Sequence, residues 1–513
     1  MNLLVLAALA GAAKLPADAP VYVALRPAQL ADDVTFLNLA ARSAPEVARA
    51  EDELRDLLHF DPFKKSDWVR IGIDPETPVL MGLGRSDPAE VERTLKTLEK
   101  GQKAAEPDLS HRIVARVTDV AKLKTFLGDL ARTPLGKQIK SNIDGDQLVL
   151  DIGKPPKQVG FDPTRGSAKL LGEGALSMYL PLDRLPTLGT ATGAAAVARA
   201  LKAVDPKHRK MLGKQGAMEA RTCLEWQQTG GALFDDFAAW VRLGQGAWEY
   251  HAAWGENALG KIAMAMAAAD DGLLDPTATA DSMVAGQLYL NGTALLRGVQ
   301  RMGVMRDATY AEEHIRLCGG AAMVIAGLRY WPQGLAFALD EVARDPEIGP
   351  FVLAARNVVF LIRNIKNSQF DIDGALAATM ELPPGGAAEK KLCAESRKVK
   401  KGGREFVVCG GHGRERVVWD ALPAGQRVAA VLPDDKNVDW WMALKRGTPR
   451  KNPPELATLR VDLAKLMAAA MRDQDPMVKA AVQMFAAGRT RAIGSIHPDG
   501  DLLRMDLRVD SGR

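Results

Sequence analysis

The chain has no long apolar run beyond its first residues and no excess of charge of either sign. Its most apolar internal stretches, 319–327 and 351–362, are bounded or interrupted by arginine and are shorter than the ~20 residues of a membrane-spanning helix. The 67 Lys and Arg nearly balance the 63 Asp and Glu, which leaves a formal net charge of +4. That balance provides no global field for nucleic acid. We therefore expect no nucleic-acid partner. We also expect no transmembrane segment once the apolar first residues, interpreted below as a cleaved leader, are removed.

Recognisable catalytic and metal-binding motifs are also missing. There is no Gly-x-Ser-x-Gly elbow and no Ser-x-x-Lys pair that would place a base one turn from a serine. The seven histidines are scattered singly, without the paired spacing that puts two metal ligands on one helix face. The acidic segments 142–146 and 371–373 are similar to calcium loops but lack the full ligand series and the closing Glu. We predict no metal and no cofactor.

One segment matches a phosphate-binding loop by spacing alone. Residues 255–261 read Gly-Glu-Asn-Ala-Leu-Gly-Lys, and such loops surround phosphates with a Lys and backbone N–H groups. The next residue is Ile262, so the hydroxyl that would hold Mg²⁺ is absent, and the residues after it alternate like a strand. We interpret the match as coincidental and expect no saturable ATP binding.

The first 13 residues predict a signal peptide. Apolar residues run from Leu3 to Ala13, which is the length of a secretory apolar region, and Ala10-Gly11-Ala12 offers the small residues that a signal peptidase accepts. Met1-Asn2 carries no positive charge, and a start codon assigned too late would account for this. The alternative is a buried N-terminal strand. We expect a secreted or periplasmic protein whose mature chain begins near Ala13 or Lys14.

The four cysteines agree with an oxidising compartment, because they are even in number and all lie in the predicted mature chain. Cys393 and Cys409 flank a predicted hairpin over residues 398–406, so a disulfide between them would close a short loop. Cys223 and Cys318 would then pair across a long loop. The alternative is four unrelated buried thiols.

A β-hairpin pattern occurs four times, each time after a helix-like stretch. Three copies contain Asp-Gly, which readily adopts the positive φ angles of a tight turn between alternating strands. The copies cover residues 138–150, 248–264, 370–380 and 493–507. We expect Asp144, Asp373 and Asp499 to occupy equivalent turns.

Short alternating strands that lead into helices precede these hairpins, at residues 21–27, 176–183, 287–293 and 458–462. Two further steps of this kind are predicted from residues 79–84 into Asp87 and from 113–117 into Asp119. Together the patterns predict an α+β fold of repeated strand–helix–β-hairpin units, with mainly antiparallel sheets and helices packed on one face. The predicted boundaries are 1–13 for the signal peptide, 14–170, 171–280 and 281–382 for three α+β units, 383–447 for a Cys-containing insertion or linker, and 448–513 for a fourth α+β unit.

The start of the chain resembles a family of uncharacterised secreted bacterial proteins. The resemblance is carried by Leu15-Pro16-Ala17-Asp18 after the leader, by Tyr22-Val23, by Phe60-Asp61-Pro62 and by Gly72-Ile73-Asp74-Pro75. It covers about the first 80 residues of the chain. It implies an envelope or extracellular location and a chain of alternating helices and strands, and it implies no activity.

Two sets of side chains are candidate binding surfaces. The first consists of Trp248, Tyr250, Trp254 and Met264, whose aromatic members alternate on one predicted strand beside a predicted helix that carries Trp240. Such rings stack on sugars or line an apolar cavity, and the alternative is ordinary core packing.

The second set is a basic stretch in the predicted insertion, which would contact the phosphates of an anionic envelope polymer. It comprises Lys390, Lys391, Arg397, Lys398, Lys400 and Lys401. Because Glu389, Glu395 and Glu405 are interleaved with these bases, the alternative is a solvated loop of mixed charge.

These observations favour a secreted or periplasmic, non-enzymatic binding or structural protein of the bacterial envelope, whose partner is a protein or an envelope polymer. Two alternatives stay open. One is a carrier of a lipid or other apolar ligand, which an apolar pocket lined by Trp248, Tyr250 and Met264 would favour. The other is a hydrolase with a dispersed active site, which a His bonded to both a hydroxyl and a carboxylate would favour.

Overall fold

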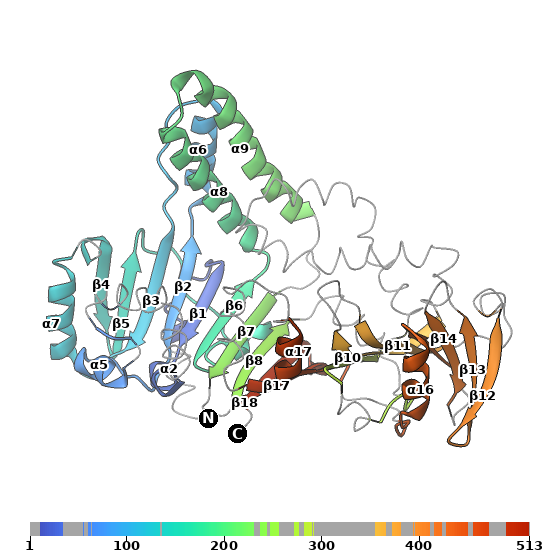
Figure 1. Cartoon of the computed structure of the whole chain (residues 1–513). Coiled ribbons are helices and arrows are strands. Elements are labelled where there is room, and N and C mark those ends of the chain that lie inside the picture. The colour runs from blue at the N-terminus through green and yellow to red at the C-terminus, as the bar shows by residue number, and fades with distance from the viewer. Residues whose placement is uncertain are drawn as a thin grey trace. The chain divides into compact units, whose positions relative to one another are not determined.

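The computed structural model (Figure 1) divides the chain into two compact units. Unit 1 covers Met1–Gln245, Tyr250–Asn257 and Arg306–Gln333, and unit 2 covers Gly246–Glu249, Ala258–Met305 and Gly334–Arg513. The class is α+β as predicted, with mostly antiparallel strands. The structure describes residues 11–33, 55, 60–62, 64–133, 136–229, 236–243, 247–255, 271–275, 282–289, 291, 354–365, 372–380, 393, 395–410, 415–422, 427–449, 455–470 and 489–511.

Unit 1 is built on an antiparallel sheet with the spatial order β4-β5-β3-β2-β1-β6-β7 in its described part. Along its central strands β1 and β2, buried residues alternate with half-buried ones, as the two-residue period of a pleated strand requires. The strands of this sheet are β1 (Val21–Leu25), β2 (Val79–Arg85), β3 (Ser110–Arg116), β4 (Ile139–Asp144), β5 (Gln147–Ile152), β6 (Leu176–Pro181) and β7 (Asp236–Leu243). The next strand in the chain is β8 (Ala247–Trp254).

The predicted steps from strand to helix are confirmed where they fall on described residues. β1 leads directly into a helix, and the carboxylates of Asp87 and Asp119 accept hydrogen bonds from backbone N–H groups at the starts of two others. These caps satisfy donors that have no partner inside the helix. The helices of unit 1 are α2 (Pro27–Asp33), α5 (Lys65–Arg70), α6 (Pro88–Glu99), α7 (Val120–Leu130), α8 (Leu185–Lys202) and α9 (Pro206–Thr229), with short 3-10 turns η1 (Gly136–Gln138) and η2 (Gly166–Leu170).

The residues that follow the predicted cleavage site belong to the core of unit 1. Leu15 and Tyr22 are completely buried, and the Tyr22 ring stacks on Phe161 with centroids 4.0 Å apart. The Lys14 carbonyl accepts a hydrogen bond from Arg112 (3.1 Å). A mature chain that begins at Ala13 or Lys14 retains all of these contacts. Residues 1–10 lie outside the described residues, so the signal peptide stays a prediction.

A bulge between β2 and β3 brings a histidine into the structure of the sheet. The register shifts between Gly82 and Arg85, and Gly84 has a φ of 75° there. The Gly84 N–H donates to Nδ1 of His111 on β3 (3.2 Å). Burial lowers the pKa of His111 below its ordinary value of 6.5, because desolvation disfavours the charged imidazolium.

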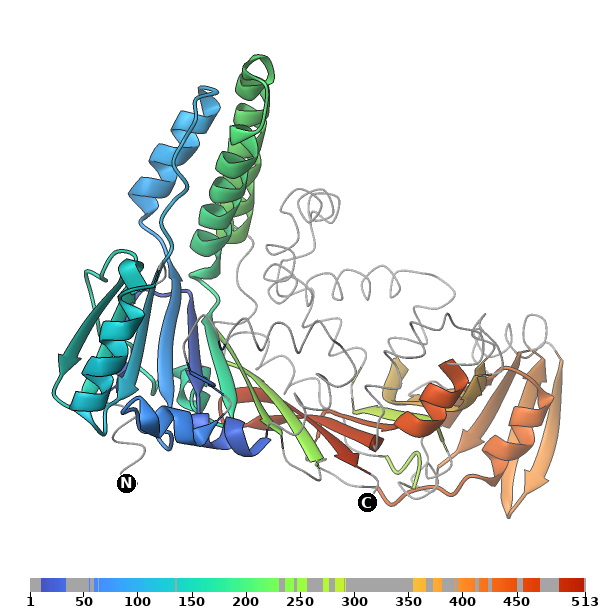
Figure 2. The same ribbon diagram turned by 60° about the vertical axis from the view of Figure 1, so that its left-hand side comes forward.

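Three helices of unit 1, α6, α8 and α9, pack against one another and project beyond the ends of the strands (Figures 1 and 2). We call them the helical arm. Leu95 and Leu98 of α6 are buried there against alanines of α8 and α9. Two glycines of α9 permit the close approach: a Cβ at Gly213 would lie 2.2 Å from the Leu98 carbonyl oxygen, and one at Gly216 would lie 2.7 Å from Val197. These helices therefore depart from the prediction that helices pack on one face of a sheet.

The described strands of unit 2 pair antiparallel in the order β12-β13-β14-β15-β11-β10-β9-β16-β17-β18. Its buried core includes Trp441 of α16 and Phe406 of β13, both completely buried. The elements are β9 (Val284–Tyr289), β10 (Ala355–Ile365), β11 (Ile372–Met380), β12 (Ser396–Lys401), β13 (Arg404–Gly410), β14 (Arg416–Ala421), β15 (Arg427–Leu432), α16 (Asp435–Ala443), β16 (Ala457–Asp462), α17 (Leu463–Ala470), β17 (Arg489–Asp499) and β18 (Leu502–Ser511).

The segment predicted as an insertion or linker, 383–447, contributes β12–β15 and α16 to this unit. β15 pairs with β11 from Leu376↔Val431 onward, so the segment continues the same sheet. An ion pair within it is almost completely buried: the Asp420 carboxylate lies 2.7 Å from Arg446, whose guanidinium also lies over the Trp441 ring. Burial lowers the pKa of Arg446, although Asp420 opposes this effect.

Two of the four predicted hairpins are confirmed. β4–β5 and β17–β18 turn at Gly145 and Gly500, whose φ angles are 64° and 62°. The prediction for residues 370–380 was wrong, because 372–380 form the single strand β11. Asp373 lies opposite Asn364 within the β10–β11 ladder, and its carboxylate pairs with Arg363 (2.8 Å). Cross-strand pairing there overrides the local turn preference of Asp-Gly. The hairpin predicted at 248–264 falls largely outside the described residues, since 256–264 are not among them.

Candidate functional site

The predicted aromatic set has the environment of a packed core. Trp248 on β8 is 5 % exposed, and Tyr250 and Trp254 are half-buried. The helix predicted for Trp240 was wrong, because this residue lies on β7 and its ring stacks on His251 with centroids 4.9 Å apart. Burial alternates along residues 238–241, as in a strand, and pairing with β6 selects this conformation. Met264 and the phosphate-loop residues 256–261 lie outside the described residues, as does Ile262.

Three of the four described members of the predicted basic stretch form ion pairs with acids. Its described members, Arg397, Lys398, Lys400 and Lys401, lie on β12 and not on a loop. Arg397 lies 3.7 Å from Asp435, Lys398 lies 3.3 Å from Glu405, and Lys401 lies 3.2 Å from Asp439. In the described part of unit 2 β12 has β13 on one side only, and charged side chains on such an edge oppose pairing with another chain. Lys390 and Lys391 are not among the described residues.

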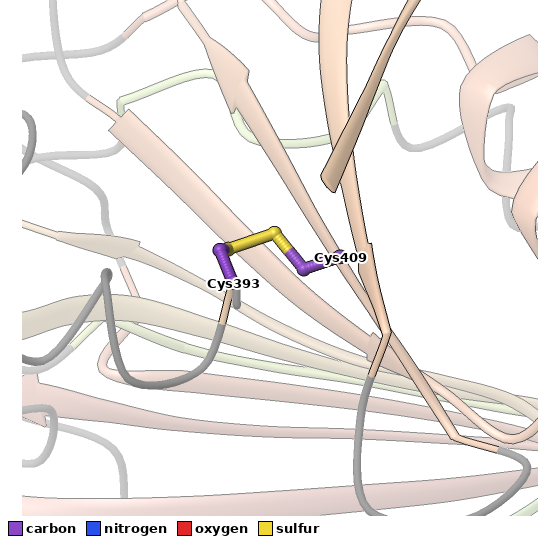
Figure 3. Close-up of a disulfide and its surroundings, with 2 residues drawn as sticks. All are labelled: Cys393 and Cys409. Carbon is purple, nitrogen blue, oxygen red and sulfur yellow. A yellow bond between two sulfur atoms is a disulfide. The ribbon is translucent and has the colours of Figure 1, made fainter. Parts of the chain in front are cut away.

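The disulfide between Cys393 and Cys409 is confirmed (Figure 3). It ties the chain ahead of β12 to the fully buried Cys409 on β13, with the two Cα atoms 4.7 Å apart. The hairpin that it closes turns at Gly402 and Gly403, whose φ angles are 59° and 78°. The side chains of Cys223 and Cys318 are outside the described part of the chain, so the second pairing stays a prediction.

Two buried carboxylates, one in each unit, accept hydrogen bonds from hydroxyl and amide groups, but neither is arranged like a nucleophilic site. Asp236 accepts hydrogen bonds from the Ser167 hydroxyl (2.7 Å) and the Tyr179 hydroxyl (3.3 Å). The pKa of Tyr179 is raised, mainly by burial and to a smaller extent by the negative charge of Asp236. Asp271 accepts from Thr379 (2.8 Å) and Asn357 (2.9 Å). Among the described residues no imidazole joins either carboxylate, which a Ser/His/Asp site would require.

The tip of the helical arm is strongly basic. Here α6 ends and α8 turns into α9, and the two turns touch, because a Cβ at Gly101 would lie 2.5 Å from the Lys210 Cα. Five exposed lysines, which we call the basic tip, surround this contact. They are Lys100, Lys103, Lys207, Lys210 and Lys214. Within the ranges that the structure describes, none of these ammonium groups forms an ion pair.

The acids beside the basic tip are engaged in other contacts. Glu106 accepts from Arg199 and Lys202 at 2.9 Å each, and these hydrogen bonds lower the pKa of Glu106 to about 2. Asp205 accepts from the backbone N–H of Lys207 (2.9 Å) at the start of α9. The positive potential of the five lysines is therefore left facing solvent, at the end of a helical projection.

One face of α9 combines this charge with exposed methionine. Lys207, Met211, Lys214 and Met218 follow the spacing i, i+4, i+7 and i+11, so they lie within an arc of about 60° around the helix. Met211 is 63 % exposed and Met218 is 58 % exposed. We call these four residues the Lys/Met face. Gly213 and Gly216 are buried on the side away from this face, against α6 and α8.

Sequence reasoning missed this site, although part of it was visible. The run Lys207-His208-Arg209-Lys210 is as basic as the stretch near residue 400, and the methionines that follow interrupt an otherwise polar helix face. The contribution of Lys100 and Lys103 was not visible, because it depends on the contact between Gly101 and Lys210.

Comparison of the chain with protein-family models, with curated proteins and with solved structures found no match. In the described part of the chain, no cluster of three or more His, Cys, Asp or Glu side chains is placed to hold a metal ion. No helix among these residues is both long enough and apolar enough to cross a lipid bilayer.

Proposed function

We propose that the protein is a secreted or periplasmic, non-enzymatic binding protein of the bacterial envelope, and that its helical arm binds an anionic partner. One observation carries the proposal: five exposed lysines without ion pairs among the described residues gather at the tip of the arm. The chain as a whole is nearly neutral, so this concentration is local. A projecting patch of one sign raises the local concentration of oppositely charged partners.

Export has independent support. The Cys393–Cys409 disulfide is a structural bond of the kind that persists in oxidising compartments. Leu15, directly after the predicted cleavage region, is completely buried. Removal of residues 1–13 would leave every strand of unit 1 in place, although it would remove Ala12, which is buried in the same core.

The repeated-unit architecture remains part of this proposal, and strand pairing supports it. β6, β9 and β16 each pair antiparallel with the next described strand, which is β7, β10 and β17 respectively. In addition, β1 pairs with β6 and β9 pairs with β16, so the first strands of neighbouring predicted units adjoin in both pairs. Two units joined through their first strands would bury an edge that each would otherwise expose.

The binding proposal is tested by titrating the full mature protein with a soluble polyanion, dextran sulfate, at 50 and 200 mM salt. We expect binding that weakens with salt, since counterions screen exposed charges. The variant Lys207→Gln/Lys210→Gln/Lys214→Gln should lose about tenfold or more in affinity, as three uncompensated charges leave the contact. The matched control is Arg397→Gln/Lys398→Gln/Lys401→Gln on β12, which removes the same charge from a surface already paired with acids. Equal effects of the two triple variants, or no binding at either salt, would refute the proposal.

A further inference from the structure

We infer that the anionic partner of the arm is the surface of a lipid bilayer rich in anionic phospholipid. In this arrangement Met211 and Met218 enter the interfacial region while Lys207 and Lys214 contact headgroup phosphates. The inference rests on the proposed function, because it names the partner of the same basic tip.

The Lys/Met face carries more than charge, and the additional part points to lipid. A soluble polyanion requires only cations, and it offers no apolar phase in which a methionine would be buried. Met211 and Met218 are nevertheless more than half exposed. Apolar side chains flanked by lysines at helical spacing are typical of helices that lie in a membrane interface.

The geometry of the face suits a fluid surface. Residues 207–218 extend over about 16 Å of helix, which is long enough for two methionines and two lysines to touch one bilayer together. Lysine stems reach past apolar neighbours while the ammonium groups remain at the polar surface. Methionine is unbranched and adapts to irregular surroundings, as lipid chains require.

The arm presents this face without any rearrangement. α9 is held from behind by α6 and α8, where Gly213 and Gly216 permit backbone-close packing. The helix is therefore formed before it meets a partner, and binding does not have to compensate for folding it. The arm projects beyond the ends of the strands of unit 1 (Figure 2).

The test is flotation of the full mature protein with vesicles of phosphatidylcholine alone, and with vesicles in which three lipids in ten are replaced by phosphatidylglycerol. Met211→Gln/Met218→Gln keeps the charge and the helix propensity of α9, so it separates apolar insertion from electrostatic attraction. Met211→Leu/Met218→Leu is the conservative rescue. Leu376→Gln, at a residue of β11 that is 53 % exposed, is the matched control for removing an exposed apolar group elsewhere. Circular dichroism verifies that each variant is folded.

We expect binding to the anionic vesicles only, weakened about tenfold by the glutamine pair, retained by the leucine pair and unchanged in Leu376→Gln. Dextran sulfate binding should be the same in the glutamine pair as in the natural chain. If Met211→Gln/Met218→Gln binds the anionic vesicles as tightly as the natural chain does, the inference is overturned. So would dextran sulfate binding without vesicle binding, or a preference for duplex DNA over vesicles, and in those cases the proposed anion-binding function would stand. Binding to neither vesicles nor dextran sulfate would reject both.

Discussion

The helical arm depends on one glycine that can be tested directly. At Gly213 of α9, an added Cβ would lie 2.2 Å from the Leu98 carbonyl oxygen and 3.2 Å from Leu201. The first contact involves backbone, which cannot rotate away, so Gly213→Ala must push α9 away from α6. Overpacking of this kind costs about 2 kcal/mol. Replacing a glycine inside a helix with alanine stabilises the helix by about 1 kcal/mol through its higher helix propensity. Subtracted from the overpacking cost, this leaves a net destabilisation of about 1 kcal/mol.

A second glycine of the arm provides the matched control. At Gly193 of α8 the nearest atom to an added Cβ is the Ala220 methyl at 3.6 Å, which is ordinary contact. Gly193→Ala therefore keeps the propensity gain without the clash and should stabilise the arm by about 1 kcal/mol. The same substitution at two sites of one arm should thus differ by about 2 kcal/mol, with opposite signs.

Hydrogen exchange measured by mass spectrometry is the appropriate assay, because it resolves opening of individual helices in a chain with two compact units. Amides of α6 and α9 should exchange faster in Gly213→Ala and more slowly in Gly193→Ala, with those of unit 2 unchanged. If both variants protect the arm equally, α9 does not approach α6 as closely as the structure has it, and the account of the arm fails.

Three further outcomes follow from the fold. Replacing Cys393 and Cys409 by alanine should lower the free energy of unfolding of unit 2 by about 3 kcal/mol, since the bond closes a loop with a sequence separation of 16, and denaturant unfolding measures this. Because the pKa of His111 is lowered in the folded protein, the unfolded chain protonates this imidazole first as pH falls. The contribution of the neutral imidazole to stability should therefore be fully present above pH 6.5 and decline below it. Urea unfolding measured from pH 7 to 5 should show a shallower decline in His111→Asn than in the natural chain. Asp420→Ala leaves the Arg446 guanidinium buried without its carboxylate and should cost about 3 kcal/mol in thermal or denaturant unfolding, whereas a loss below about 1 kcal/mol would show that solvent reaches Arg446.

Local features of the fold could be predicted from the sequence because their causes are local. Asp87 and Asp119 cap the helices that follow them, and Gly145 and Gly500 adopt the turn conformations that their positions require. The Cys393–Cys409 bond was predictable for the same reason, as a hairpin lies between its ends. Asp373 shows the limit: Asp-Gly favours a turn, but pairing along β10 determines the strand, and that partner is not specified within the motif.

The candidate site could not be predicted because it is assembled from distant segments. Lys103 and Lys207 are neighbours of one tip only through helix packing that sequence periodicity does not reveal. Near residue 400 a more continuous basic run was considered from its own charges. There Asp435 and Asp439 come from α16, outside the run, and they pair with its charges. A count of charges along the chain therefore does not reveal which basic side chains lie beside acids in the fold.

The position of β9 determines when unit 2 can be completed during synthesis. β9 (Val284–Tyr289) hydrogen-bonds on one side to β10 at residues 357–362 and on the other to β16 at residues 457–461. Its two neighbours emerge from the ribosome long after it does, so both of its edges stay open until most of the chain has been made. Strands that wait for distant partners form slowly and are prone to pairing with the wrong chain. An exported chain would avoid that interval in the cytosol by crossing the membrane unfolded, and we expect its passage to depend on a chaperone that keeps β9 apart from other strands.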